Sequence, residues 1–375
     1  MRPIQMVDLK QQYLKLKGEI DAAVIGVLES TAFINGPQVQ RFAEALQQYN
    51  GVKHVVPCAN GTDALQIAMM ALGLQPGDEV ITPSFTYIAT TEVIALLGLK
   101  PVFVDVDPQT FNVDPEAVKK AITKKTKAIV PVHLYGQAAP MEEITAIAQA
   151  HNLFVIEDNA QAIGCDYKFN NGSTKKTGSI GTVSGTSFFP SKNLGGYGDG
   201  GAILTNDDAL AAQLRMVANH GQSKRYYHEV VGCNSRLDTI QAAILEIKLK
   251  HLDEYIAARQ RVADYYDAAF AAHSGITTPY RAPWSNHVFH QYTLQLEGID
   301  RDGLNAHLAA HHIPSMIYYP VPAHRQSMFA SFGTASNHLP VTDWLTERVL
   351  SLPMHTEMDE EQLAFITKTV LDFAS

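Results

Sequence analysis

The sequence predicts an α/β fold in which helices cover a mostly parallel β-sheet, with a smaller α+β unit toward the C-terminus. Three observations support this prediction. Short apolar runs alternate with helical patterns between about residues 52 and 205. The runs are nearly continuous in valine, isoleucine and phenylalanine, as expected for strands that are buried on both faces. They recur roughly every 20 to 30 residues, a spacing that fits right-handed crossover units.

Seven short apolar segments are predicted to be strands of this sheet, because turn-forming residues bound them. They cover residues 54–58, 79–83, 100–106, 128–134, 153–158, 183–189 and 201–205. Four helices are predicted between the strands, at residues 61–74, 87–97, 115–122 and 141–151. This alternation of strand and helix is typical of a parallel sheet.

The pattern changes after about residue 236. Residues 239–270 are amphipathic and predict one or two long helices. The segments that follow are an alternating run at 287–296, a helix at 301–312, an apolar run at 313–320 and a last helix at 359–374. We therefore expect a large domain over residues 1–245 and a small α+β domain over residues 246–375.

Composition excludes several classes of function. The 375-residue chain has a net charge of -9 and scattered lysines and arginines, whereas nucleic-acid binding needs a basic stripe. No run approaches the roughly 18 to 20 apolar residues that a membrane span requires. Residues 1–10 contain no apolar signal core. We expect a cytoplasmic protein that binds neither nucleic acid nor membrane.

The cysteines and histidines do not indicate a metal site. Cys58, Cys165 and Cys233 are far apart, which suits a reducing compartment and suggests neither disulfides nor zinc. His307 and His311 have a spacing that can bind metal from one helix. No acidic or cysteine partner is near them in the sequence, so we interpret them as part of a solvated helix face and expect no metal.

Lys192 is the most informative residue of the predicted site. It lies in the run S-F-F-P-S-K-N-L-G-G-Y-G-D-G-G (187–201), downstream of a strand that ends in Asp158. A loop lysine taken alone is usually solvated. A lysine together with a buried strand-end aspartate, however, is what pyridoxal phosphate needs. The amine forms a Schiff base with the cofactor aldehyde, and the carboxylate keeps the ring nitrogen protonated.

Other candidates also follow strand ends, where ligands of an open parallel sheet bind. Gly61 and Thr62 open a helix whose N–H groups suit a phosphate, although a plain helix cap explains them equally well. Phe85 could stack on a ring, although an isolated phenylalanine is more often core. Gln161 could bond a ring hydroxyl, and Ser187 could reach a phosphate. Together these residues predict a pyridoxal phosphate site.

The glycine run between residues 195 and 201 does not predict a dinucleotide site. A dinucleotide fingerprint follows a strand and opens a helix, whereas these glycines precede a strand. We expect them to let the backbone turn tightly beside the cofactor.

Several longer motifs connect the chain to a known family. They are V-D-L-K-Q-Q-Y (7–13), A-N-G-T-D-A-L (59–65), P-S-F-T-Y-I-A-T (83–90), V-I-E-D-N-A-Q-A-I-G (155–164), the 187–201 run, C-N-S-R-L-D (233–238) and L-P-M-H (352–355). They resemble the motifs of the nucleotide-sugar aminotransferases, the DegT/DnrJ/EryC1/StrS group. The resemblance covers essentially the whole chain. It implies the type I fold of pyridoxal-phosphate-dependent transferases, as in aspartate aminotransferase, and a homodimer with active sites at the subunit interface.

The resemblance also implies a role for each candidate residue. Lys192 would carry the cofactor, and Asp158 would bind its ring nitrogen. The remaining cofactor contacts would come from Gln161 (ring oxygen), Phe85 (ring face), Gly61, Thr62 and Ser187 (phosphate) and Asn234 (phosphate of the other subunit). Related dehydratases have histidine in place of the lysine, so Lys192 favours transamination.

Within the group, the chain is most similar to enzymes that aminate UDP-2-acetamido-2-deoxy-3-oxo-glucuronate in lipopolysaccharide O-antigen synthesis. Arg236 could clamp the sugar carboxylate with two parallel hydrogen bonds, or it could form an interface salt bridge. Tyr318 and Tyr319 would lie near the sugar, although the family often has histidine at the position of Tyr318.

The expected reaction is a transamination in two halves, in which L-glutamate donates the amino group to the keto sugar. One alternative keeps the cofactor but aminates C4 of a 4-keto-6-deoxy sugar, which lacks the carboxylate. Another alternative is a non-catalytic regulator with the same fold. Such regulators carry a fused DNA-binding module, for which the sequence shows no spare length or basic segment.

Overall fold

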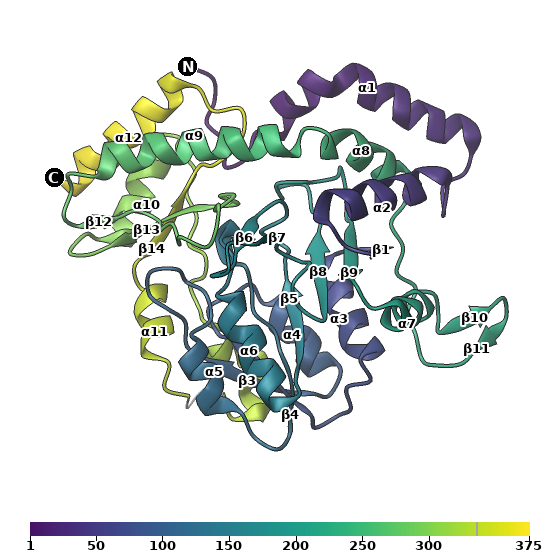
Figure 1. The fold of residues 1–375 in the computed structure, drawn as a ribbon. Coiled ribbons are helices and arrows are strands. Elements are labelled where there is room, and N and C mark those ends of the chain that lie inside the picture. Colours follow the sequence, from purple (N-terminus) through teal and green to yellow (C-terminus); the bar gives the residue numbers. More distant parts are fainter. Residues whose placement is uncertain (335–336) are drawn as a thin grey trace.

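The computed structural model describes residues 1–334 and 337–375, and a seven-stranded sheet forms its centre (Figure 1). The strand order is β1-β9-β8-β5-β4-β2-β3. The strands are β1 (His54–Cys58), β2 (Glu79–Pro83), β3 (Lys100–Val104), β4 (Thr126–Ile129), β5 (Phe154–Asp158), β8 (Val183–Ser187) and β9 (Gly201–Thr205). Strands β8, β5, β4, β2 and β3 are parallel, and β9 runs antiparallel to both of its neighbours. The prediction of a mostly parallel sheet is therefore confirmed.

Helices cover both faces of this sheet because successive strand residues point to opposite sides. Val155 of β5 packs into one core and Ile156 into the other. The helices on the Val155 side are α2 (Pro37–Asn50), α5 (Pro115–Ala121), α6 (Met141–His151) and α8 (Thr239–Leu249). Those on the Ile156 side are α3 (Gly61–Ala71), α4 (Ala89–Leu96) and α7 (Asp208–Ala218). This burial on both faces explains the nearly continuous apolar strands.

The amphipathic stretch at 239–270 forms two helices, α8 and α9 (Leu252–Phe270). Helix α8 packs against α2 and against α1 (Leu9–Ser30), on the side of the large sheet. Helix α9 continues from it toward the C-terminal sheet (Figure 1). The domain boundary expected at residue 245 falls inside α8, and Leu252 and Ile256 at the start of α9 still pack into the core on the Val155 side of the large sheet.

A three-stranded antiparallel sheet organises the C-terminal unit. Its strands are β12 (Ile276–Thr277), β13 (Tyr292–Leu296) and β14 (Val349–Leu352), and they pack with α9, α10 (Arg301–Ala310) and α12 (Glu360–Ala374). Ile4 joins this core, so the first residues of the chain belong to the C-terminal unit. The run at 313–320 forms no strand, only a single bridge between Met316 and Ser351.

The C-terminal unit also reaches back to the large sheet. Helix α11 (Pro340–Thr346) begins beside Asp105, whose carboxylate accepts hydrogen bonds from the N–H groups of Val341 and Thr342 at 2.9 and 2.7 Å. Two small hairpins complete the fold, β6 (Asp166–Lys168) with β7 (Thr174–Lys176) and β10 (Gln222–Lys224) with β11 (Tyr227–His228). The second hairpin stands out from the body of the molecule (Figure 1).

Neither a membrane span nor a metal cluster is found in residues 1–334 and 337–375. No helix there is long and apolar enough to cross a bilayer. No group of three or more histidine, cysteine, aspartate or glutamate side chains there could hold a metal ion.

Candidate active site

Asp158 ends β5 as a buried carboxylate, with only 5% of its surface exposed. Its Oδ2 accepts a hydrogen bond from the hydroxyl group of Thr90 on α4 at 2.7 Å, and its Oδ1 accepts one from the N–H of Ala160 at 3.1 Å. In the described part of the chain, no cationic side chain forms an ion pair with it. A buried carboxylate is costly without a positive partner. Asp158 therefore fits a ligand that brings a cationic N–H, such as a protonated pyridine ring.

Lys192 lies in the loop between β8 and β9, where its main-chain N–H donates to the carbonyl of Phe189 at 2.8 Å. The residue is partly exposed, but the surrounding protein desolvates its amine. This desolvation lowers the pKa of Lys192 to about 8, against the opposing effect of the nearby Asp158 charge. A large fraction of the amine is therefore neutral near pH 8 and able to attack an aldehyde.

The residues predicted to bind phosphate, Gly61, Thr62 and Ser187, lie where α3 begins beside the end of β8. The N–H groups of Gly61 and Thr62 have no acceptor within the described part of the chain, and Asn60 caps the helix by accepting from Asp63 N–H at 2.8 Å. A Cβ at Gly61 would lie 2.7 Å from the Cβ of Ser187. Only glycine therefore lets the free helix N-terminus approach Ser187 this closely. Helix N-terminal N–H groups and a serine hydroxyl suit a phosphate.

The glycine run brings β9 against the same turn. A Cβ at Gly201 would lie 2.4 Å from the carbonyl carbon of Asn60, which no real side chain tolerates. The glycines of residues 195–201 do not adopt positive φ values. These glycines therefore allow the backbone to pack closely, at Gly201 against Asn60.

Gln161 joins the Asp158 region to the C-terminal unit. Its Oε1 accepts from the N–H of Tyr135 at 2.7 Å, and its Nε2 donates to the hydroxyl group of Tyr319 at 3.1 Å. Burial raises the pKa of Tyr319, so this hydroxyl stays protonated at neutral pH. Tyr318 lies alongside, with its carbonyl accepting from the hydroxyl group of Tyr135. Gln161 of the large unit and Tyr318 and Tyr319 of the C-terminal unit therefore lie together.

Phe85 does not fit the predicted ring stack. It has no exposed surface. Its ring stacks with that of Phe111, with the ring centres 6.0 Å apart, and makes edge contacts with the rings of Tyr135 and Tyr319. Tyr87, two residues later in the same motif, is 56% exposed, and its ring lies 6.2 Å from that of Tyr319. The structure thus leaves no face of Phe85 for a cofactor, and Tyr87 is the aromatic side chain that can offer one.

Asn234 and Arg236 flank a residue that is fastened to the start of α3. Ser235 between them donates to the carboxylate of Asp63 at 2.6 Å and accepts from Ala59 N–H at 3.0 Å. Asn234 is exposed, and Arg236 forms no ion pair or side-chain hydrogen bond within residues 1–334 and 337–375. Both side chains are therefore available to a ligand or to a second subunit.

Sequence reasoning missed His290, which lies close enough to Lys192 for their charges to interact. Burial, followed by the positive charges of Lys192 and Arg259, lowers the pKa of His290 well below its ordinary value. The side chain is 8% exposed, and its Nδ1 has no hydrogen-bond partner in the described residues. His290 belongs to the alternating run at 287–296, and nothing in that run indicates a position beside Lys192.

These features have the chemistry of one class of enzyme. A desolvated lysine amine, a buried carboxylate without a cation and a free helix N-terminus meet at the strand ends of an α/β sheet. This is the arrangement of a pyridoxal-phosphate-dependent transferase. The DegT/DnrJ/EryC1/StrS aminotransferase family model matches residues 15–371, and the chain belongs to this family. The predicted family, type I fold and pyridoxal phosphate cofactor are thus confirmed.

Individual relatives match over nearly the full length. The chain is 48% identical over 363 residues to the UDP-2-acetamido-2-deoxy-3-oxo-D-glucuronate aminotransferase of Pseudomonas aeruginosa, covering 97% of this chain and 98% of that one. It is 48% identical over 372 residues to a Geobacillus stearothermophilus protein named pleiotropic regulatory protein, covering 99% and 98%. The crystal structure of S. venezuelae DesV in complex with a ketimine intermediate matches with a TM-score of 0.95 at 39% identity, covering 100% and 99%.

Proposed function

We propose that this protein transfers the amino group of L-glutamate to C3 of UDP-2-acetamido-2-deoxy-3-oxo-glucuronate, and that the product serves lipopolysaccharide O-antigen synthesis in the cytoplasm. The observation that carries the reaction is the desolvated amine of Lys192 beside the buried carboxylate of Asp158. The likeness to the Pseudomonas aeruginosa aminotransferase supports the choice of sugar.

Each residue of the site would have a separate role in this reaction. When bound, pyridoxal phosphate supplies an aldehyde that takes up an amino group and a ring that accepts electrons. Asp158 would hold a proton on the ring nitrogen, and the N–H groups at the start of α3 would bind the phosphate with Ser187. The neutral amine of Lys192 would take the proton from the α-carbon of L-glutamate. Tyr87 would cover the ring in place of Phe85.

Arg236 is the residue proposed to select the sugar. A guanidinium group without an ion pair in the described chain can bind a carboxylate through two parallel hydrogen bonds. A 3-oxo-glucuronate sugar carries such a carboxylate, and a 4-keto-6-deoxy sugar does not. Loss of the Arg236 side chain should therefore impair amination of a 3-oxo-glucuronate sugar but not of a 4-keto-6-deoxy sugar.

We expect Arg236→Ala to lower kcat/KM for the 3-oxo-glucuronate substrate by about tenfold to a hundredfold, the range for a lost charge-assisted hydrogen bond of about 1.5 to 3 kcal/mol. The measurement incubates the purified protein, glutamate and candidate UDP- and dTDP-keto sugars and identifies products by mass and NMR. Arg236→Lys is the matched control, because it keeps the charge and loses the planar fork, and its loss should be smaller. Amination of a 4-keto-6-deoxy sugar, unchanged by Arg236→Ala, would replace our substrate with the alternative. Absence of turnover with every sugar would favour a regulator.

We also propose a homodimer in which Asn234 reaches the phosphate of the other subunit. Large apolar side chains are exposed on α1, on the turn after it and around the β10–β11 hairpin. They are Leu14, Ile25, Leu28, Phe33, Ile34, Tyr226, Tyr227, Val230 and Val231. Exposed apolar surface of this extent is typical of an interface. Sedimentation should give twice the 41.1 kDa mass of one chain, whereas a monomer at assay concentration would contradict the shared site.

A further inference from the structure

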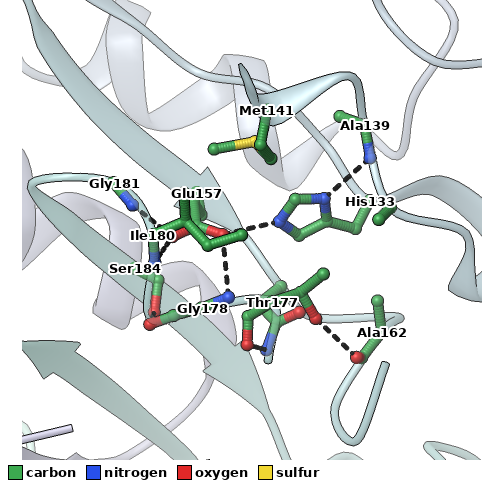
Figure 2. Close-up of polar contacts among 12 residues, drawn as sticks. His133, Ala139, Met141, Glu157, Ala162, Thr177, Gly178, Ile180, Gly181 and Ser184 are labelled. Atoms are coloured by element: carbon green, nitrogen blue, oxygen red, sulfur yellow. Dashed lines mark hydrogen bonds and ion pairs between the residues drawn. The ribbon is translucent and has the colours of Figure 1, made fainter. Parts of the chain in front are cut away.

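Glu157 and His133 form a buried hydrogen-bonded pair behind the end of β5 (Figure 2). Glu157 precedes Asp158 in the strand, so its side chain points to the opposite face of the sheet. Glu157 is 1% exposed and His133 is fully buried, and their Oε2 and Nε2 atoms lie 2.9 Å apart. The side chains of Glu157 and His133 form no hydrogen bond with any residue proposed to contact the cofactor. The role of the pair in the protein is therefore not catalysis itself.

The hydrogen bonds of the pair define its protonation. Nδ1 of His133 accepts from the N–H of Ala139 at 3.0 Å, so Nε2 carries the proton and donates to Glu157. Glu157 also accepts from three main-chain N–H groups, those of Gly178 at 2.8 Å, Ile180 at 2.7 Å and Gly181 at 2.6 Å. Figure 2 shows these donors converging on the carboxylate. Each oxygen of Glu157 thus has two donors.

These bonds keep Glu157 ionised despite its burial. Burial alone would raise the pKa of Glu157, but the bonds from His133 and from the Gly181 and Gly178 N–H groups outweigh it and hold the pKa below its ordinary value. A buried carboxylate with this many donors has little freedom to move, because each displacement leaves a buried donor unpaired. Glu157 therefore fixes the backbone around it.

The backbone that the pair fixes is that of Asp158. The N–H of Asp158 donates to the carbonyl of Pro131 at 2.9 Å, and its carbonyl accepts from the N–H of His133 at 3.1 Å. His133 is thus bonded to Glu157 through its ring and to Asp158 through its main chain. On the other side, the Glu157 carboxylate fastens residues 178–181, which lead into β8, the strand that ends at Ser187.

We propose that Glu157 and His133 are positioning residues, which hold the Asp158 carboxylate at the place where it meets the cofactor ring nitrogen. This inference rests on the proposed role of Asp158. The charge that acts on the Lys192 amine is that of Asp158, so a displaced Asp158 carboxylate is detectable through Lys192. Replacing Glu157 by glutamine keeps the shape of the side chain but removes the charge. It also places an NH2 group against converging donors.

The test is a double-variant cycle. The rate at which Lys192 reacts with an amine-directed reagent is followed against pH in cofactor-free protein by peptide mass spectrometry, and pyridoxal phosphate affinity is measured by absorbance titration. Glu157→Gln should weaken cofactor binding by about tenfold, a size typical of residues coupled in one network. It should also move the Lys192 titration in the same direction as Asp158→Asn does. In the Asp158→Asn background, Glu157→Gln should move the Lys192 titration no further.

Two further variants keep the result decisive. Ile156→Val, one residue earlier in β5, removes a buried methyl group and should lower the unfolding midpoint without moving the Lys192 titration. His133→Leu removes the side-chain donor to Glu157 and replaces Glu157→Gln in the cycle if that variant does not fold. If Glu157→Gln moves the Lys192 titration equally in the wild-type and the Asp158→Asn backgrounds, the inference is overturned. The proposed function would still stand. An Asp158→Asn protein with unchanged cofactor affinity and Lys192 titration would overturn the role of Asp158, and the inference with it.

Discussion

Replacing Lys192 with alanine is expected to abolish turnover and the absorbance band of the covalent bond between lysine and cofactor. The alanine side chain supplies no amine for the aldehyde and no base for the α-proton of the amino acid. Loss of a positioned proton-transfer group alone costs about a hundredfold to ten-thousandfold in rate. The measurements are the visible spectrum of protein loaded with pyridoxal phosphate and the rate of 2-oxoglutarate release from glutamate.

Two controls separate this role from a general effect on the loop. Ser191→Ala changes the preceding residue, whose side chain is not part of the proposed site, and should retain both the band and the activity. A small primary amine added to Lys192→Ala should restore part of the rate, because it supplies the missing base in solution. A fully active Lys192→Ala protein would show that another group binds the aldehyde, and the assignment would fall.

Local sequence predicted the core of the large sheet closely. The bounds of β1, β2, β9 and α6 agree with the predicted ranges 54–58, 79–83, 201–205 and 141–151. Strands buried on both faces leave an apolar run that turn residues end sharply. Helix α1 was not predicted: only four of its 22 residues are buried, and exposed apolar residues such as Leu14, Ile25 and Leu28 blur any single apolar face. The apolar run at 313–320 forms only a bridge at Met316, since an apolar run alone does not distinguish a strand from an irregular segment.

The site shows a similar limit. Lys192, Asp158, Gly61 and Ser187 could be named because each follows a strand and has a chemically distinctive side chain. The motif P-S-F-T-Y could not reveal which aromatic ring stays free. Phe85 is enclosed by Phe111 and Tyr135, which are distant in the sequence, whereas Tyr87 stays exposed. Such long-range packing leaves no local signal in a single sequence.

Asp158→Asn is expected to lower turnover by about tenfold to a thousandfold. An adjacent opposite charge shifts a pKa by about 1 to 3 units, so the Asp158 carboxylate would raise the pKa of the ring nitrogen and keep it protonated. The asparagine variant loses this support. The amide has nearly the same shape, so Thr90 can still donate to its oxygen. The folded structure should therefore survive. Steady-state kinetics and a pH titration of the cofactor absorbance measure the effect. Asp158→Glu restores the charge and should recover part of the rate.

Asp158→Asn should also change the pKa of Lys192 in the cofactor-free protein. Burial lowers the pKa of Lys192 to about 8, and the negative charge of Asp158 acts in the opposite direction. Removing that charge leaves desolvation unopposed, so the pKa of Lys192 should fall below about 8. The neutral amine then appears at lower pH, and the pH at which Lys192 becomes reactive toward an amine-directed reagent moves down. Thr90→Val keeps the charge and removes only a hydrogen bond, so it should leave this titration nearly in place. An upward shift in Asp158→Asn would mean that Asp158 does not act on Lys192 as a charge, and the two residues could not then form one catalytic site.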